Sequence, residues 1–154
     1  MAIGILGVVI LSISLLFYRK IAINGIPREQ GEVRLNDAEL YDKRIKSFVA
    51  METMALEIYK LPRNTAKAKL LYEINDRGIY YWNENIKLLK ELDQLNLPNN
   101  IHERDKLLIH YCSLRIKSYN FVYKMVNEDT EKYKDSITVY DKQIKAIIDG
   151  LKAK

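Results

Sequence analysis

The sequence 133-YKDSITVYDKQIKAIIDGL-151 carries the clearest structural pattern in the chain. Its apolar residues recur at spacings of 4, 3, 4, 3 and 4: Tyr133, Ile137, Tyr140, Ile144, Ile147 and Leu151. This alternation places them on one stripe of an α-helix, as in helix bundles and coiled coils. We therefore expect a helix that begins near Thr130 and packs against other helices of the same chain.

Three further segments show helical periodicity, and prolines separate them. The expected helices run from about 37 to 60, from 64 to 95 and from 100 to 128, with Pro62 and Pro98 in the connections. No segment alternates apolar and polar residues for long enough to predict a strand. Residues 36–154 are therefore predicted to form one all-α domain, an antiparallel up-down four-helix bundle.

Two local features refine these helices. Asn36 is a plausible N-cap of the first helix, because Glu39 follows it at capping-box spacing. Gly78 lies in the middle of the second helix, where glycine costs about 1 kcal/mol relative to alanine. Such a glycine indicates a close helix contact or a bend.

The N-terminal stretch 2-AIGILGVVILSISLLFY-18 contains no charged residue, and Arg19 and Lys20 follow it directly. As a helix it would be about 26 Å long, close to the bilayer's hydrocarbon thickness of about 30 Å. We expect residues 1–20 to form a transmembrane anchor that contacts membrane lipid through residues 2–18. A cleaved signal peptide and a buried core helix are the alternatives, although the stretch lacks a basic n-region, a small-residue cleavage site and a polar face.

Residues 21–35 are predicted to be a juxtamembrane linker, because glycine and proline interrupt any helix there. Positive charge beside a span favours the cytoplasmic side, and the charges Arg19, Lys20, Arg28 and Arg34 all follow the span. The bundle is therefore expected in the cytoplasm. The lone Cys112 agrees with this, since it cannot form an internal disulfide.

The charge distribution bears on possible partners. The formal net charge is +5, a modest excess that does not indicate nucleic-acid binding. A local basic run consists of Lys60, Arg63, Lys67 and Lys69, with no acidic residue between Glu57 and Glu73. In an up-down bundle this run lies at the end far from the membrane. It is either a solvated helix start or a docking surface for an acidic protein partner.

A buried polar layer is a second candidate site. Glu52, Asn75 and Arg115 each interrupt the apolar stripe of a different predicted helix, and Tyr140 lies at the same height on the last helix. Buried charges need partners, so we expect an ion pair between Glu52 and Arg115, bridged by Asn75 and Tyr140. A phase error of one residue on any helix would instead place its side chain in water.

No catalytic or metal-binding motif is found. His102 and His110 stand about 12 Å apart on one predicted helix, too far to share a metal. Cys112 lies on an apolar stripe, as a small core residue does. Most of the eleven tyrosines have core spacing, and Tyr80, Tyr81 and Trp82 offer an alternative aromatic groove.

These observations favour a non-catalytic, single-pass membrane protein without a cofactor, whose bundle binds another protein as an adaptor, scaffold or small subunit of a membrane assembly. The alternative is a membrane-anchored bundle that senses or binds a small ligand. Catalysis has the least support, because no reactive side chains are expected to converge.

Overall fold

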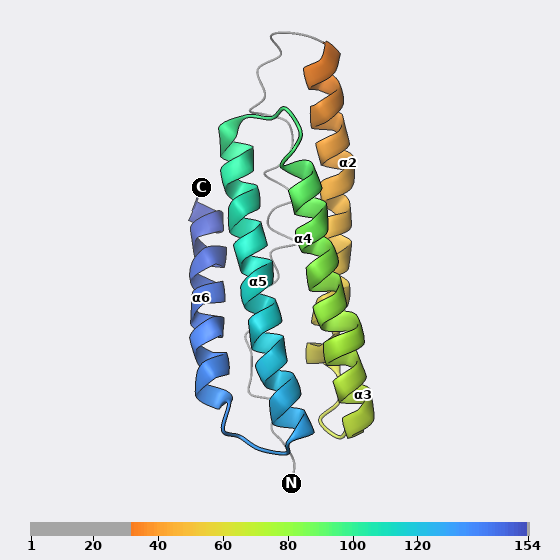
Figure 1. Cartoon of the computed structure of the whole chain (residues 1–154), viewed down its shortest axis with the longest axis vertical. Coiled ribbons are helices and arrows are strands. Elements are labelled where there is room, and N and C mark those ends of the chain that lie inside the picture. Colours follow the sequence, from red (N-terminus) through yellow and green to blue (C-terminus); the bar gives the residue numbers. More distant parts are fainter. Residues whose placement is uncertain (1–31, 154) are drawn as a thin grey trace.

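The computed structural model describes the backbone of residues 32–153 and the side chains of residues 37–152. Every regular element in this part of the chain is helical, and no strand occurs within it. The expected all-helical bundle is therefore confirmed for these residues (Figure 1). The predicted span at 2–18 and the flanking Arg19 and Lys20 lie outside the described residues. None of the described helices is long and apolar enough to cross a membrane.

The first rod consists of α2 (Glu32–Ala55) and the short 3₁₀ helix η1 (Leu56–Lys60). Because α2 begins at Glu32, Asn36 lies inside the helix and the predicted N-cap is wrong. The residues after Gly31 include Glu32, Arg34 and Leu35, which favour a helix, so the helix extends into the predicted linker. The rod ends before Pro62, because a proline disfavours the helical conformation of the residue that precedes it. That preceding residue, Leu61, is extended, with φ −68° and ψ 142°.

The second rod contains a break in helical type. It comprises α3 (Lys67–Tyr72), the π-helix η2 (Glu73–Ile79) and α4 (Tyr80–Leu92). A π-helix forms i→i+5 hydrogen bonds and so holds extra residues in each turn, which rotates the preceding segment relative to α4. Ile74 is consequently fully buried, whereas Asn75 is exposed.

Gly78 lies inside the π-helix at a close helix contact, as its position in the sequence suggested. A Cβ atom on Gly78 would stand 2.2 Å from Cε1 of Tyr119. The Tyr119 hydroxyl donates a hydrogen bond of 2.7 Å to the carbonyl oxygen of Ala55, where α2 gives way to η1. The Tyr119 side chain therefore contacts both of the first two rods.

The third and fourth rods are α5 (Asn99–Asn127) and α6 (Lys134–Ala153). A Schellman-type turn ends α5, with Asp129 at φ 49° and a 3.1 Å hydrogen bond from the Thr130 amide to the Met125 carbonyl. The turn includes Thr130, where the last helix was expected to begin. The helix α6 therefore begins later in the chain.

Successive rods run antiparallel, and α2 packs against α4, α4 against α5 and α5 against α6 (Figure 1). Large side chains from all four rods fill the core, among them Phe48, Trp82, Tyr111 and Ile148. The η1–α3 loop and the α5–α6 turn lie at one end, which we call the distal tip. The start of α2 and the α4–α5 turn lie at the other end.

Gly78→Ala should destabilise the protein by about 2 kcal/mol, because the added methyl group overlaps the Tyr119 ring. Gly150→Ala is the matched control, since a Cβ there meets no atom within 4 Å. In that exposed helical position the substitution should stabilise by about 0.5–1 kcal/mol. Urea unfolding of the full-length protein measures both changes, and equal effects would contradict the close packing.

Candidate functional site

The charged residues predicted for the polar layer are both buried at the centre of the bundle. Glu52 on α2 is 0% exposed and Arg115 on α5 is 1% exposed. The Tyr111 hydroxyl connects them: it donates to Glu52 Oε1 at 2.8 Å and accepts from Arg115 Nε at 3.3 Å. The sequence placed Tyr111 only on an apolar stripe, so its bridging role was not predicted.

Aromatic rings surround the guanidinium group of Arg115. Its Cζ atom lies 5.9 Å from the Trp82 ring centre and 5.3 Å from that of Tyr111, distances at which the ring faces attract a cation. Burial opposes the charge, but the surrounding tyrosines Tyr111, Tyr59 and Tyr119 outweigh it and raise the pKa of Arg115. The side chain therefore remains a cation inside the core.

The other two members of the predicted layer lie elsewhere. Asn75 is exposed because the π-helix shifts the helical phase, so its assignment to a buried layer was wrong. Tyr140 is half-buried and stacks on Phe121, with ring centres 5.9 Å apart. The buried asparagine is Asn85, which donates to the carbonyl oxygen of Phe48 at 3.3 Å.

Asn85 had a detectable signal in the sequence, and Asp141 was found only in the structure. Asn85 follows Trp82 by three positions and precedes Leu89 by four, which is the spacing of the buried stripe. Asp141 is next to Tyr140 and is half-buried. Burial raises the pKa of Asp141, and the Arg115 charge opposes that rise. The buried cation is thus coupled to α6 as well as to α2.

A small apolar cavity lies between this polar cluster and the distal tip. Its volume is about 50 Å³, and residues from η1, α3, η2, α5 and α6 form its walls. Ligand pockets for small organic molecules are about 300–1,000 Å³. The cavity is therefore too small for a metabolite, and the polar cluster beside it is best explained as a structural link between rods.

A second buried polar cluster, which the sequence did not predict, lies toward the other end of the bundle. The Tyr41 hydroxyl donates to Asp105 Oδ1 at 2.6 Å and accepts from Arg104 at 2.8 Å. Asp105 is 0% exposed, and burial raises its pKa to about 6. Nearby, His102 Nδ1 lies 2.8 Å from Asp93 Oδ1.

The other candidate side chains do not come together in one site within the described residues. Residues 37–152 contain no group of three or more His, Cys, Asp and Glu side chains placed to hold a metal. Cys112 is fully buried, as predicted, and burial raises the pKa of its thiol. Trp82 is in the core whereas Tyr80 is 53% exposed, so the aromatic run 80–82 does not line one groove.

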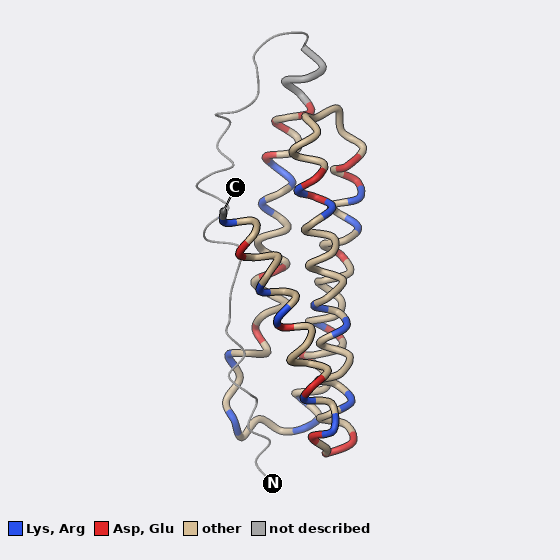
Figure 2. The backbone as a smooth tube through the Cα atoms, turned by 90° about the vertical axis from the view of Figure 1, so that its left-hand side faces the viewer, with Lys and Arg blue, Asp and Glu red and all other residues tan. Residues whose placement is uncertain are grey.

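The basic run spans the end of η1, the connection to α3 and the first turn of α3 at the distal tip, and we call residues 60–69 the basic loop. Lys60, Arg63, Lys67 and Lys69 are all exposed. Figure 2 shows Lys and Arg positions at the lower end of the bundle, together with acidic ones. Lys60 pairs with Glu57 at 2.7 Å, and Lys67 Nζ donates to the carbonyl oxygen of Asn127 at 2.7 Å. The second bond ties this loop to the end of α5.

No protein-family model, curated protein or solved structure matches this chain.

Arg115→Leu should lower the free energy of unfolding by about 3–5 kcal/mol, because Glu52 then keeps a buried charge without its cation. Adding Glu52→Leu in the same protein should recover much of that loss, since no charge is left in the core. Urea unfolding of the wild type and both variants measures the difference. A single variant as stable as the wild type would show that the buried charges are not coupled.

Asp105→Asn should remove a pH dependence of stability. The folded-state pKa of about 6 exceeds the ordinary 3.8, so wild-type stability from this group is present below pH 3.8 and is lost as pH rises through 6. The variant should therefore gain about 3 kcal/mol relative to the wild type between pH 4 and pH 7. Thermal unfolding across this range tests it, with the exposed Asp76→Asn as the charge-matched control.

Proposed function

We propose that this protein is a non-catalytic, membrane-anchored helical interaction module that binds an acidic protein partner through its distal tip. The observation that carries the proposal is the composition and position of the basic loop. Residues 60–69 include four Lys and Arg side chains and no Asp or Glu, and all four cations are exposed. The loop lies at the opposite end of the bundle from the start of α2 (Figure 1).

The proposed topology presents this loop to partners rather than to lipid. In this proposal, residues 2–18 lie in the bilayer and residues 19–31 connect them to the start of α2. The bundle faces the cytoplasm, as the positive charges after the span favour. Since α5 has 29 residues, it is about 43 Å long, so the distal tip extends roughly that far beyond the anchored end.

Two of the four cations are the best candidates for direct contact. Arg63 and Lys69 make no hydrogen bond or ion pair with any other side chain in the part of the chain that the structure describes. Lys60 and Lys67 already have partners in the fold, so their side chains help to hold the loop against the bundle. Cations at the edge of an interface chiefly speed association and select against partners of the wrong charge.

A sensor that binds a small ligand is the alternative function, and the cavity volume weighs against it. The cavity of about 50 Å³ would have to open several-fold to admit a typical ligand. Protein binding at the tip needs no such rearrangement, because the cations are already on the surface.

Photo-crosslinking in the native membrane tests the proposed interaction. A photo-crosslinking amino acid at the exposed position Asn64, in the full-length protein, should capture one protein partner. Arg63→Gln with Lys69→Gln should weaken capture about tenfold, because two favourable charge contacts are lost. Added salt should weaken it as well.

Lys117→Gln with Lys142→Gln is the matched control, since it removes two exposed cations from the sides of α5 and α6. This variant should capture the partner like the wild type. Absence of any adduct at position 64, or equal loss in both double variants, would exclude the basic loop as the docking surface.

A further inference from the structure

The small cavity near the distal tip has the geometry of a socket that opens at the surface. Its floor is formed by α5, including Val122 and Val126, and its two walls come from η1–α3 and from α6. Neither η1 nor α3 is among the described elements that pack closely on α6. The walls are therefore held apart above the floor, and the space between them is lined almost entirely by carbon.

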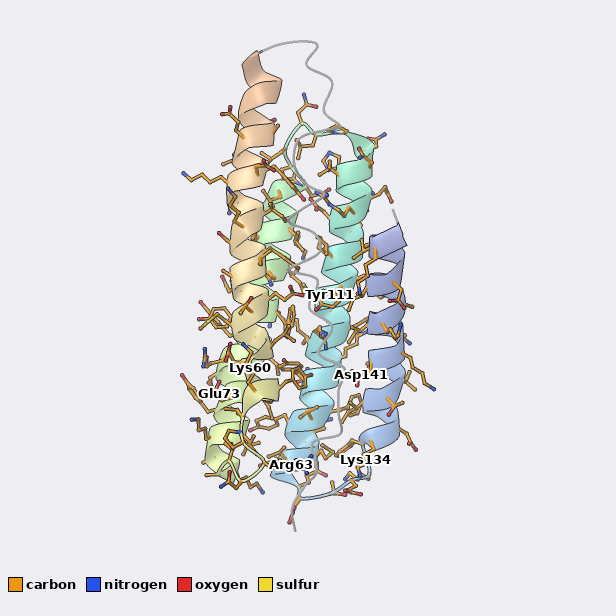
Figure 3. The ribbon with its side chains drawn as sticks, turned by 180° about the vertical axis from the view of Figure 1, so that it is seen from behind. Lys60, Arg63, Glu73, Tyr111, Lys134 and Asp141 are labelled. Carbon is orange, nitrogen blue, oxygen red and sulfur yellow. The ribbon has the colours of Figure 1, made fainter. Side chains whose placement is uncertain are left out.

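The rim of the socket reaches solvent. Thr138 on α6 is exposed, and Tyr59, Leu70 and Lys134 are half-buried, whereas Ile74 at the inner end is fully buried. The socket thus passes from an accessible rim to a buried apolar interior. Figure 3 shows Lys134 on α6 and Arg63 on the loop at the same level near the lower end of the bundle.

The basic loop is continuous with one wall of the socket. Tyr59 and Leu70 line the socket, and residues 60–69 form the loop that joins them. A segment that places a side chain between these walls from the η1–α3 side therefore passes beside the cations of the basic loop. This arrangement complements a segment with an apolar side chain next to carboxylates.

The socket volume limits what can enter. Its volume of about 50 Å³ is about one third of that of the cavity of about 150 Å³ that accepts benzene. A space of this size suits the branched end of one leucine or isoleucine side chain and is too small for an acyl chain.

We propose that the socket between η1–α3 and α6 receives one aliphatic side chain of the partner, with acidic residues of the same segment contacting the basic loop. This inference rests on the proposed function and adds the chemical class of the partner segment. The apolar contact supplies affinity and the charges supply orientation, which is how an anchor in a pocket and a polar rim divide their roles in known interfaces.

Filling the socket tests the proposal in the full-length protein in its native membrane. Val122→Phe places a ring on the socket floor and should leave the thermal midpoint unchanged or higher, since it fills a void. It should reduce capture at position 64 by about tenfold or more, the effect expected when a buried aliphatic anchor is excluded. Val139→Phe, on the exposed side of α6, is the matched control and should change neither measurement.

A second variant covers the case in which Val122→Phe does not fold. Thr138→Trp blocks the socket from its exposed rim without altering the floor and should reduce capture similarly. Undiminished capture by either folded variant would overturn the socket proposal while leaving the basic loop as the docking surface. Absence of capture in the wild type would instead overturn the proposed function itself.

A crosslinker placed at Thr138 identifies what occupies the socket. Mass spectrometry of the adduct should show a partner peptide in which an aliphatic residue lies within a few positions of Asp or Glu. A lipid adduct, a second copy of this chain or a crosslink to residues 2–18 would each overturn the proposal, because each names a different occupant.

Discussion

The buried charge of Arg115 has to be compensated inside the bundle, and this requirement limits how the rods can be arranged. Moving an ion out of water costs several kcal/mol unless partners replace the lost hydration. Here the Tyr111 hydroxyl joins Arg115 to the buried Glu52, and the rings of Trp82 and Tyr111 face the guanidinium group. A shift of α2 along α5 would separate these groups, so the polar link fixes the register that apolar packing alone leaves adjustable.

The contact between Tyr119 and the second rod depends on that register. The Tyr119 ring occupies the space that a side chain at position 78 would need, and its hydroxyl satisfies the Ala55 carbonyl where α2 tightens into a 3₁₀ turn. The π-helix places Gly78 opposite this ring. Irregular turns in the first two rods therefore meet at one aromatic side chain, and the η1–α3 loop continues from them toward the distal tip.

The bundle separates its stabilising groups from the surface proposed for binding. Buried polar side chains lie within the body of the bundle, where they connect the rods to one another. The distal tip instead carries the exposed cations of residues 60–69 and a small apolar socket between walls that do not pack closely on one another. Because the socket has five different elements in its walls, its shape depends on the register set in the core.

The sequence by itself determined the four amphipathic segments, the prolines between them and the burial of Glu52 and Arg115, because spacing and polarity report which face of a helix turns inward. It also located the basic run. The sequence could not show which face of the second rod turns toward the core. The π-helix that sets this face arises from packing around Gly78 and Tyr119 and has no local signal of its own. For the same reason Ile74 rather than Asn75 faces the core. Only the tertiary structure decided the Tyr111 bridge and the socket, because both depend on side chains that are distant in the sequence and meet only when the rods pack.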